Sequence, residues 1–400
     1  MPVVVYVLGL SIFGLGTTEF MIAGLLPLIA DDLGVSVPAV GGLISAFAIG
    51  MVVGAPALTA ASLRLPRKTT LIAALTLFIA GQVLGALAPT YALLLVARVV
   101  TAVATGAFWG VAAVTAVRAV TPDRTSRALS VLLSGLTVAN VVGVPAGTWI
   151  GQWLGWRATF WAVAIVAVLS LVGVVVAVPR DSRETAVPRL RDELRTFTSA
   201  RLWVALTTIV LYGGAVFGIF SYAAPLITDV AGMRESAVPA ILFLFGLGAF
   251  FGNVIGGRVA DRGILMNLHI SFVALLATMV ALGLAAGSAV AVVALLFTMG
   301  VTGYSAAAAL NGRVFRLAEE APTLASAVNT SAFNVGNTIG PWLGGTAIAA
   351  GLGFRAPIWV GVALLLGALT LTFVSRAMDA RLRTNERRGE LSGAGAGATP

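Results

Sequence analysis

Long apolar runs of membrane-spanning length recur along this chain, and they constrain its fold more than any other feature. Hydrophobic residues make up 59% of the sequence and charged residues 10%, against about 45–50% and 25% in soluble domains. A helix needs about 20 apolar residues to cross a bilayer, and only helices or closed barrels satisfy their backbone groups there. Unbroken runs favour helices over barrel strands, so we predict an all-α membrane protein.

Twelve of these runs are predicted to be transmembrane helices. Their ranges are 5–30, 38–62, 70–88, 92–118, 128–151, 157–178, 202–228, 237–257, 267–286, 290–314, 327–350 and 356–376. The first run is too long for a cleavable signal peptide and lacks its basic flank. The predicted parts are a first six-helix half at 1–178, a linker at 179–201, a second six-helix half at 202–376 and a disordered tail at 377–400.

The formal net charge of +9 reflects membrane topology, and it does not indicate a nucleic-acid partner. Arginine and lysine gather at one set of predicted helix ends, in the linker and in the tail. The opposite set of ends carries only Arg157, Arg234 and Arg355. The positive-inside rule then predicts that the crowded side, with both termini, is cytoplasmic. A basic linker facing anionic lipid accounts for the remaining excess of positive charge.

One carboxylate, Glu19, lies near the middle of the first predicted span. Of the 16 Asp and Glu residues, the other 15 fall at predicted helix ends, in loops or in the tail. An ionisable side chain at this depth is costly to insert and is a candidate proton site by default. The alternative is a carboxylate that is tied to a neighbouring hydroxyl or backbone group and holds helices together.

Arg98 is the second charged residue expected inside a span. It has two possible roles: it modulates the protonation of Glu19, or it locks neighbouring backbone carbonyls in place. Thr101, Thr105 and Trp109 share its stripe at helical spacing, which suits a wet cavity better than lipid.

An internal repeat relates the two predicted halves. A shift of 198 residues aligns Pro27 with Pro225 and Arg64 with Arg262, and LGWRATFW (154–161) with LGFRAPIW (352–359). This single offset indicates duplication, and six helices per half give both halves the same orientation. A binding site is therefore predicted between the halves near the midplane, reached alternately from either side. The repeat partners of Glu19 and Arg98 are apolar, so the halves have diverged.

Candidate substrate-binding residues come from both halves. They are amides, hydroxyls and aromatic rings on helices predicted to line the cavity, where packing, helix glue or lipid contact is the alternative for each one taken alone. A polar first half opposite an aromatic second half favours an amphiphilic or aromatic substrate. The candidates are Thr101, Thr105, Trp109, Asn140, Phe217, Tyr222, Tyr304, Asn334 and Asn337.

Residue types needed by several enzyme classes are missing. Cysteine is absent and there is one histidine, which excludes thiol catalysis, disulfides, histidine-metal clusters and histidine-based triads. The sequence contains no GxxxxGK[ST] phosphate loop, so ATP does not energise the protein directly. We therefore expect neither an enzyme nor a metal or other cofactor.

Three motifs resemble those of the major facilitator superfamily. GRVADRG (257–263) resembles its GxLADRxG loop, and Arg98 followed by Gly106 resembles its helix 4 arginine motif. GVPAG (143–147) is similar to the antiporter motif of proton-driven drug exporters. The resemblance covers about residues 5–376 and implies the major facilitator fold, with twelve helices in two halves.

The resemblance also implies a set of gating residues. In the first-half copy of the loop, TAASLRLPRK (59–68), Leu63 and Pro66 stand where Asp and Gly are expected. Only the basic residues of that copy could then act as the motif does. The gating candidates are Arg64, Arg67, Gly143, Pro145, Gly147, Gly257, Asp261 and Arg262. Close helix packing is the alternative for residues 143–147, and a turn that packs one helix pair is the alternative for residues 257–263.

Within this superfamily, residues 17–36, 134–161 and 326–340 are most similar to bacterial chloramphenicol exporters and arabinose-efflux-type permeases. This resemblance implies a monomeric, proton-driven efflux transporter in the bacterial cytoplasmic membrane. Its partners would be protons, the lipid bilayer and a small amphiphilic substrate exported by alternating access. An amphenicol such as chloramphenicol is the first candidate, and an arabinose-like sugar or another solute is the alternative. The helix 5 motif favours export over import.

Overall fold

A computed structural model of the chain describes residues 1–62, 66–121, 124–179, 199–318 and 322–396. Within these ranges every regular element is a helix. Eleven helical stretches are long and apolar enough to cross a membrane. The remaining predicted span, 327–350, forms a helix rich in Asn, Ser and Thr, and the predicted all-α, twelve-helix fold is confirmed.

The first half contains the helices of the first six predicted spans. They are α1 (Val3–Phe20), α2 (Ile22–Leu33), α3 (Val37–Ser62), α4 (Arg67–Ala86), α5 (Tyr91–Arg118), α6 (Thr125–Val138), the π-helical segment η2 (Ala139–Gly143), α7 (Val144–Leu154) and α8 (Trp156–Ala177).

The second half contains the helices of the other six spans. They are α10 (Ala200–Ser221), α11 (Ala223–Pro225), the π-helical segment η4 (Leu226–Val230), the short turn η5 (Glu235–Ala237), α12 (Val238–Arg262), α13 (Ile264–Ala285), α14 (Ala289–Ser305), α15 (Ala307–Leu317), α16 (Pro322–Ala347), the π-helical segment η6 (Ile348–Leu352) and α17 (Ala356–Ala396).

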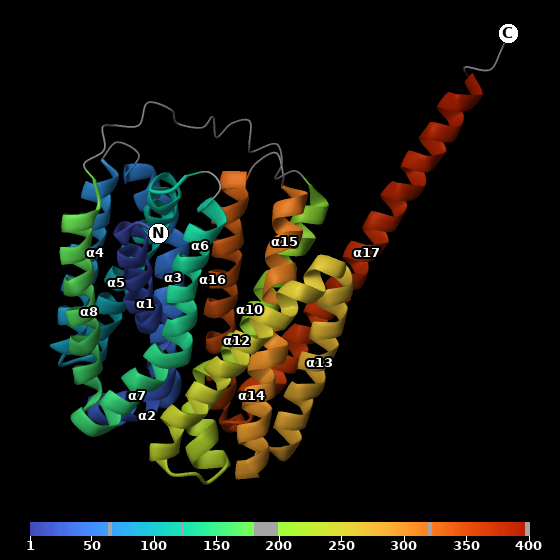
Figure 1. Cartoon of the computed structure of the whole chain (residues 1–400). Helices are drawn as coiled ribbons and strands as arrows, with labels where there is room; N and C mark the ends of the chain where they lie inside the picture. The colour runs from blue at the N-terminus through green and yellow to red at the C-terminus, as the bar shows by residue number, and fades with distance from the viewer. Residues whose placement is uncertain (63–65, 122–123, 180–198, 319–321, 397–400) are drawn as a thin grey trace.

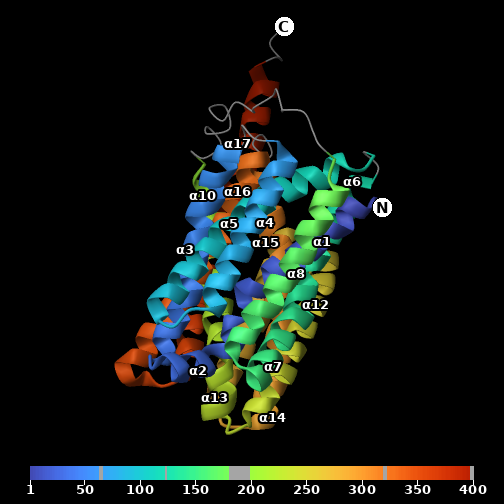
Figure 2. The ribbon, with the colours of Figure 1, turned by 90° about the vertical axis from the view of Figure 1, so that its left-hand side faces the viewer.

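The two halves stand side by side, with the blue-to-green first half on the left of Figure 1 and the yellow-to-red second half on the right. Figure 2 shows the molecule from the side of the first half, with α8, α7 and α4 toward the viewer. We call the end of the bundle where α8 ends and α10 begins the linker end, and the opposite end the far end. The linker end is uppermost in both figures.

Four spans that the sequence predicted as continuous are broken. The breaks lie at Met21, in η2, at Tyr222 and at Ala306. Two of them follow from proline, which has no N–H to donate. Pro225 leaves the carbonyl of Ser221, at the end of α10, without its usual helical donor. In the same way Pro145 leaves the carbonyl of Val141, in η2, without one. The break at Met21 has a different cause, described with the site below.

Two predicted ends at the linker end also differ. The segment 257–263, predicted as a loop, is helical through Arg262, and Gly263 alone separates α12 from α13. Beyond residue 376, where a disordered tail was predicted, α17 continues to Ala396 and projects from the bundle in Figure 1. Residues 377–390 contain many good helix formers and no proline, so helix propensity outweighed the polarity of this segment.

Close helix crossings are made possible by glycine. A Cβ added to Gly143 would lie 2.1 Å from Thr17 Oγ1, and one added to Gly340 would lie 2.2 Å from the backbone oxygen of Gly214. Larger side chains at these points would push the helix backbones apart. The first crossing packs η2 on α1, and the second packs α16 on α10.

The halves meet along α3 and α16 and at the far end. The contacts at the far end join α2 and α7 of the first half to α10, α11 and α12 of the second. Gln152 Nε2 donates to the backbone oxygen of Glu235 at 2.6 Å, and Ser45 Oγ donates to that of Thr338 at 3.0 Å. The space between the halves is therefore closed at the far end.

An ion pair at the far end ties α2 to α8. Arg157 Nη1 lies 2.5 Å from Asp32 Oδ2, and Arg157 Nη2 donates to the backbone oxygen of Ala88 at 2.9 Å. Trp156 Nε1 donates to the same Asp32 oxygen at 3.2 Å. The hydrogen bond from Arg157, with a smaller contribution from Trp156, holds the pKa of Asp32 below its ordinary value.

We expect this pair to add a small, pH-dependent increment of stability. The carboxylate contribution is present above the unfolded pKa of about 3.9 and is lost as pH falls through the lower folded pKa. Both side chains are more than a third exposed, so the pair contributes about 0–1 kcal/mol. Asp32→Asn should slightly lower the unfolding temperature of the purified protein at pH 7.

The same comparison should be made in strong acid. Wild type and Asp32→Asn should then unfold at the same temperature, because Asp32 is protonated in both states. Asp31→Asn, which changes the exposed neighbouring carboxylate, is the matched control. It should unfold at the wild-type temperature both at pH 7 and in strong acid. A gap between wild type and Asp32→Asn that persists in strong acid would contradict the assignment.

Candidate functional site

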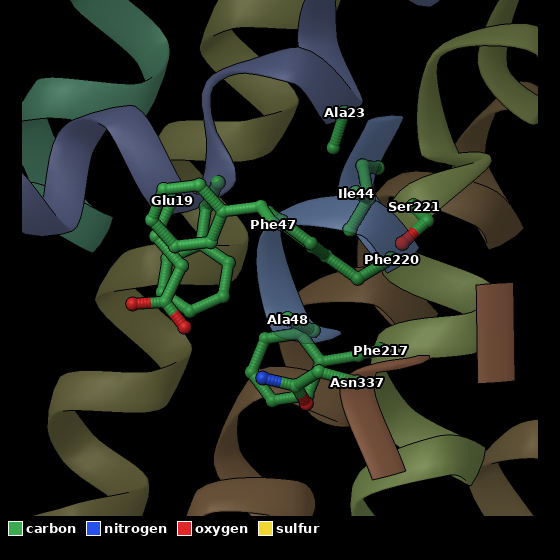
Figure 3. A pocket seen from close by; sticks show the side chains of 10 residues that line it. Glu19, Ala23, Ile44, Phe47, Ala48, Phe217, Phe220, Ser221 and Asn337 are labelled. Carbon is green, nitrogen blue, oxygen red and sulfur yellow. The ribbon is translucent and has the colours of Figure 1, made fainter. Parts of the chain in front are cut away.

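Glu19 lies in the last turn of α1, beside the break at Met21, and its side chain lines a narrow pocket between the halves. The space between atoms along this pocket is about 300 Å³, and part of it is open to the surroundings. Figure 3 shows Glu19 on one side of this space, with Phe217 and Asn337 among the side chains across from it. The other lining residues are Phe20, Ala23, Ile44, Phe47, Ala48, Phe220 and Ser221.

Aromatic rings join the two halves at the pocket. Phe20 of α1 stacks on Phe217 of α10 with ring centroids 5.1 Å apart, and both contact Phe220 edge to face. The cluster continues through Phe245 to Tyr304, at 4.8 and 6.2 Å between successive rings. Phe217 was predicted to bind substrate and does line the pocket. Phe20 was missed, although its position next to Glu19 was a usable signal.

Two polar side chains of the second half face the same pocket. Asn337 of α16 is 6% exposed and Ser221, the last residue of α10, is 1% exposed. Asn337 Oδ1 is buried without a hydrogen-bond partner. A buried polar atom left unpaired costs about 1–3 kcal/mol, so a polar ligand group has something to gain here. Asn337 was predicted from the sequence and Ser221 was not.

Arg98 of α5 is completely buried and binds the backbone at the break in the first span. Its Nη1 donates to the Thr18 carbonyl at 2.8 Å and its Nη2 to the Glu19 carbonyl at 3.3 Å. Its guanidinium lies 4.3 Å from the centre of the Phe47 ring. A continuous helix would use both carbonyls for its own hydrogen bonds, so Arg98 explains why the helix breaks here.

Of the two roles left open for Arg98, the backbone lock is the one seen. Among the described side chains, no ion pair within 4.0 Å joins Arg98 to the Glu19 carboxylate. The lock nevertheless fixes the residue that carries the candidate proton site. Gln82 of α4 completes it: its Nε2 donates to Thr18 Oγ1 at 2.5 Å, and the side chain is fully buried. Sequence reasoning missed Gln82.

Several predicted substrate contacts lie outside the pocket. Thr101 and Thr105 are buried, and their hydroxyls donate to carbonyls of their own helix at 2.8–3.0 Å. Trp109 packs beside the buried group formed by Phe47, Met51 and Ala102. Periodicity placed these residues on one stripe correctly, but that stripe faces neighbouring helices.

The other predicted amides and Tyr304 do not line the pocket either. Asn140 donates to the Leu136 carbonyl at 3.3 Å within its own helix, and Tyr304 ends the aromatic cluster behind Phe245. Asn334 donates to the Thr330 carbonyl at 3.0 Å, while its Oδ1 is buried and unpaired.

Tyr222 lies at the break between α10 and α11 and locks the far side of the pocket. It is 1% exposed, and its hydroxyl donates to the Pro341 carbonyl at 2.9 Å. A Cβ added to Gly41 of α3 would lie 2.2 Å from this hydroxyl, and one added to Gly345 would lie 2.5 Å from it. Tyr222 therefore fits between two glycines of opposite halves. We predicted that it binds substrate, but its side chain does not line the pocket.

The gating candidates are placed unevenly. Gly143 and Gly147 face Thr17 and Thr159, at 2.1 and 3.0 Å from the positions that an added Cβ would take, and Pro145 lies in the first turn of α7. This arrangement is helix packing around the bend in the fifth span.

The remaining gating candidates in the described part of the chain lie near the linker end. Arg64 and the Asp261 side chain fall outside the described part of the chain. Gly257 and Arg262 lie on the last turns of α12, and Arg67 begins α4. Among the described residues, no group of three or more His, Cys, Asp or Glu could hold a metal ion.

The comparisons with known proteins agree with this architecture. Residues 8–331 match the sequence profile of the Major Facilitator Superfamily. The chain therefore belongs to the Major Facilitator Superfamily and is a multi-pass membrane transporter for a small molecule. The predicted family and fold are confirmed.

Two similar proteins are named for chloramphenicol resistance and for inner membrane transport. A chloramphenicol resistance protein of Streptomyces lividans is 40% identical over 381 residues, which cover 94% of this chain and 97% of that protein. The inner membrane transport protein YdhP of Escherichia coli K12 is 38% identical over 368 residues, covering 92% and 94%.

A solved structure with the same fold is a bacterial homologue of the human lysosomal transporter Spinster, in an inward-facing and unoccupied conformation. It superposes with a TM-score of 0.75 at 17% identity, covering 94% of this chain and 97% of that one. At this level of identity the likeness concerns the fold alone.

We expect Gly41→Val to disturb the seat of Tyr222 and to open the far side of the pocket. The natural chain has no cysteine, so a single Ser221→Cys reporter can be labelled with a water-soluble maleimide. Labelling from the far-end side should become several-fold faster in the Gly41→Val background.

Gly42→Val is the matched control. A Cβ at Gly42 would meet only the Tyr91 hydroxyl, at 3.1 Å, so this variant should label at the parent rate. Equal rates for Gly41→Val and its parent would show that Tyr222 does not close the pocket.

Proposed function

We propose that this transporter exports a small amphiphilic compound in exchange for protons, with an amphenicol-type antibiotic as the leading substrate. One observation carries this proposal: Glu19 is the ionisable residue lining a pocket that aromatic rings and two polar side chains complete. Proton and substrate would therefore meet in the same space.

Glu19 is the proposed proton carrier. Its carboxyl lies in the span where a charge costs about 2.5–3.5 kcal/mol to insert, and it lines the pocket beside a helix break held by Arg98. A carboxyl group in an alternating pocket can gain a proton on one side and release it on the other. Arg98 would act on it through the backbone that it holds and through its positive charge.

The direction of access follows from the closed far end. Contacts of α2 and α7 with the second half block the pocket there, with Tyr222 on its far side. Positive charge gathers at the linker end, which by the positive-inside rule faces the cytoplasm together with both termini. These observations support an inward-facing state, from which the substrate enters before export.

The pocket chemistry favours a ring-bearing substrate. Stacking on Phe20, Phe217 or Phe220 would contribute about 0.5–1.5 kcal/mol per ring pair, enough for the modest affinity that release requires. Asn337 and Ser221 can serve hydroxyl or amide groups of the same compound. Chloramphenicol combines a ring with such groups, and the name of the Streptomyces relative supports this class.

A sugar is the second candidate. The unpaired Asn337 oxygen and the Ser221 hydroxyl could bind sugar hydroxyls, as the resemblance to arabinose-efflux-type permeases suggests. A sugar would leave the stacked rings of Phe20 and Phe217 without a matching π face, so we place it second.

The test is transport into inverted membrane vesicles with an imposed pH gradient. Wild type should accumulate chloramphenicol when the vesicle interior is acid, and Glu19→Gln should not, because glutamine keeps the shape but cannot titrate. Arabinose is measured in parallel, and accumulation of arabinose alone would reverse the order of substrates.

Glu235→Gln makes the same change at an exposed residue near the far end and is the matched control. It should transport like wild type. Undiminished proton-driven accumulation by Glu19→Gln would remove Glu19 from the mechanism.

A further inference from the structure

Three helices converge on one residue beside the candidate proton site. Thr18 of α1 accepts a hydrogen bond from Gln82 Nε2 on its hydroxyl at 2.5 Å and one from Arg98 Nη1 on its carbonyl at 2.8 Å. The next carbonyl, that of Glu19, accepts from Arg98 Nη2 at 3.3 Å. Gln82 on α4 and Arg98 on α5 thus hold Thr18, two residues before the end of α1, from two sides.

The internal repeat shows that the corresponding helices of the second half pack without such a polar cluster. A shift of 198 residues takes Thr18, Glu19, Gln82 and Arg98 to apolar residues in the second half. Those four are Val216, Phe217, Val280 and Leu296. The equivalent helices α10, α13 and α14 pack there with Val216 and Leu296 buried. Four polar residues at corresponding positions therefore form a unit that only the first half contains.

Two atoms of the cluster have no hydrogen-bond partner in this conformation. Gln82 Oε1 and Arg98 Nε are buried and unpaired within the described part of the chain. A cluster that served only to join helices would gain stability by pairing both atoms. An unpaired acceptor and an unpaired donor beside a helix break are instead available to polar partners that this conformation does not supply.

We propose that Gln82 is a positioning residue for proton exchange at Glu19. It fixes the Thr18 hydroxyl and thereby orients the last turn of α1, so that the Glu19 carboxyl faces the pocket. Gln82 remains neutral throughout, and the proton is gained and lost at the Glu19 carboxyl alone. This inference rests on the proposed function, because it assigns a role in the proton exchange proposed for Glu19.

Gln82→Leu tests the positioning role of Gln82. It introduces an apolar side chain of the kind that the second half has at the repeat position, Val280. Proton-driven chloramphenicol transport should slow by roughly 10- to 100-fold, the effect of misplacing a reacting group by about 1 Å. The pH dependence of the remaining transport should also change, which loss of helix packing alone would not cause.

A second pair of variants tests the same contact from the other side. Thr18→Val removes the hydroxyl that Gln82 binds and should reproduce the altered pH profile of Gln82→Leu. Thr18→Ser keeps the hydroxyl and should retain the wild-type profile. Val280→Leu, at the repeat position of Gln82, is the packing control and should also behave as wild type.

Two different failures can be told apart. The proposed function itself would be overturned if transport by wild type did not depend on pH, or if Glu19→Gln kept the same pH dependence. A wild type with that dependence, but with unchanged rates and profiles in both Gln82→Leu and Thr18→Val, would overturn only the role of Gln82. Unfolding temperatures of the purified variants identify any that fail to fold, and the Thr18 pair then decides the result.

Discussion

The structure depends on a buried arginine that must find hydrogen-bond acceptors inside the membrane. Arg98 is fully buried, and a charged group at that depth needs partners from neighbouring helices. It obtains them from the carbonyls of Thr18 and Glu19, which a regular helix would use for its own ladder. The first span therefore breaks, and the break places Glu19 at the pocket and leaves α2 to pack against the second half.

The second half reaches a similar shape by other means. Its corresponding span breaks at Tyr222 because Pro225 cannot donate to Ser221, and no charge is involved. Apolar and aromatic side chains occupy the equivalent positions, so this half offers rings where the first offers a carboxylate. Two broken helices therefore face each other across one pocket, and one brings the Glu19 carboxyl while the other brings the rings of Phe217 and Phe220.

Sequence reasoning found the features that follow from hydropathy and periodicity. It gave the twelve spans, the repeat, and the pocket residues Glu19, Phe217 and Asn337, because charge or polarity inside an apolar run is visible locally. It missed Gln82 and Ser221, since a single amide or hydroxyl gains meaning only from a partner on another helix. It also misplaced Tyr222, because helix breaks redirect the side chains that follow them.

The central claim is that substrate and proton share the pocket at Glu19, and proton release on substrate binding tests it most directly. Chloramphenicol is added to the purified protein in weakly buffered solution, and the pH change is recorded for wild type and for Glu19→Gln. We predict that wild type releases protons as chloramphenicol binds and that Glu19→Gln binds without release. Binding to wild type with no release, or equal release by Glu19→Gln, would contradict the account.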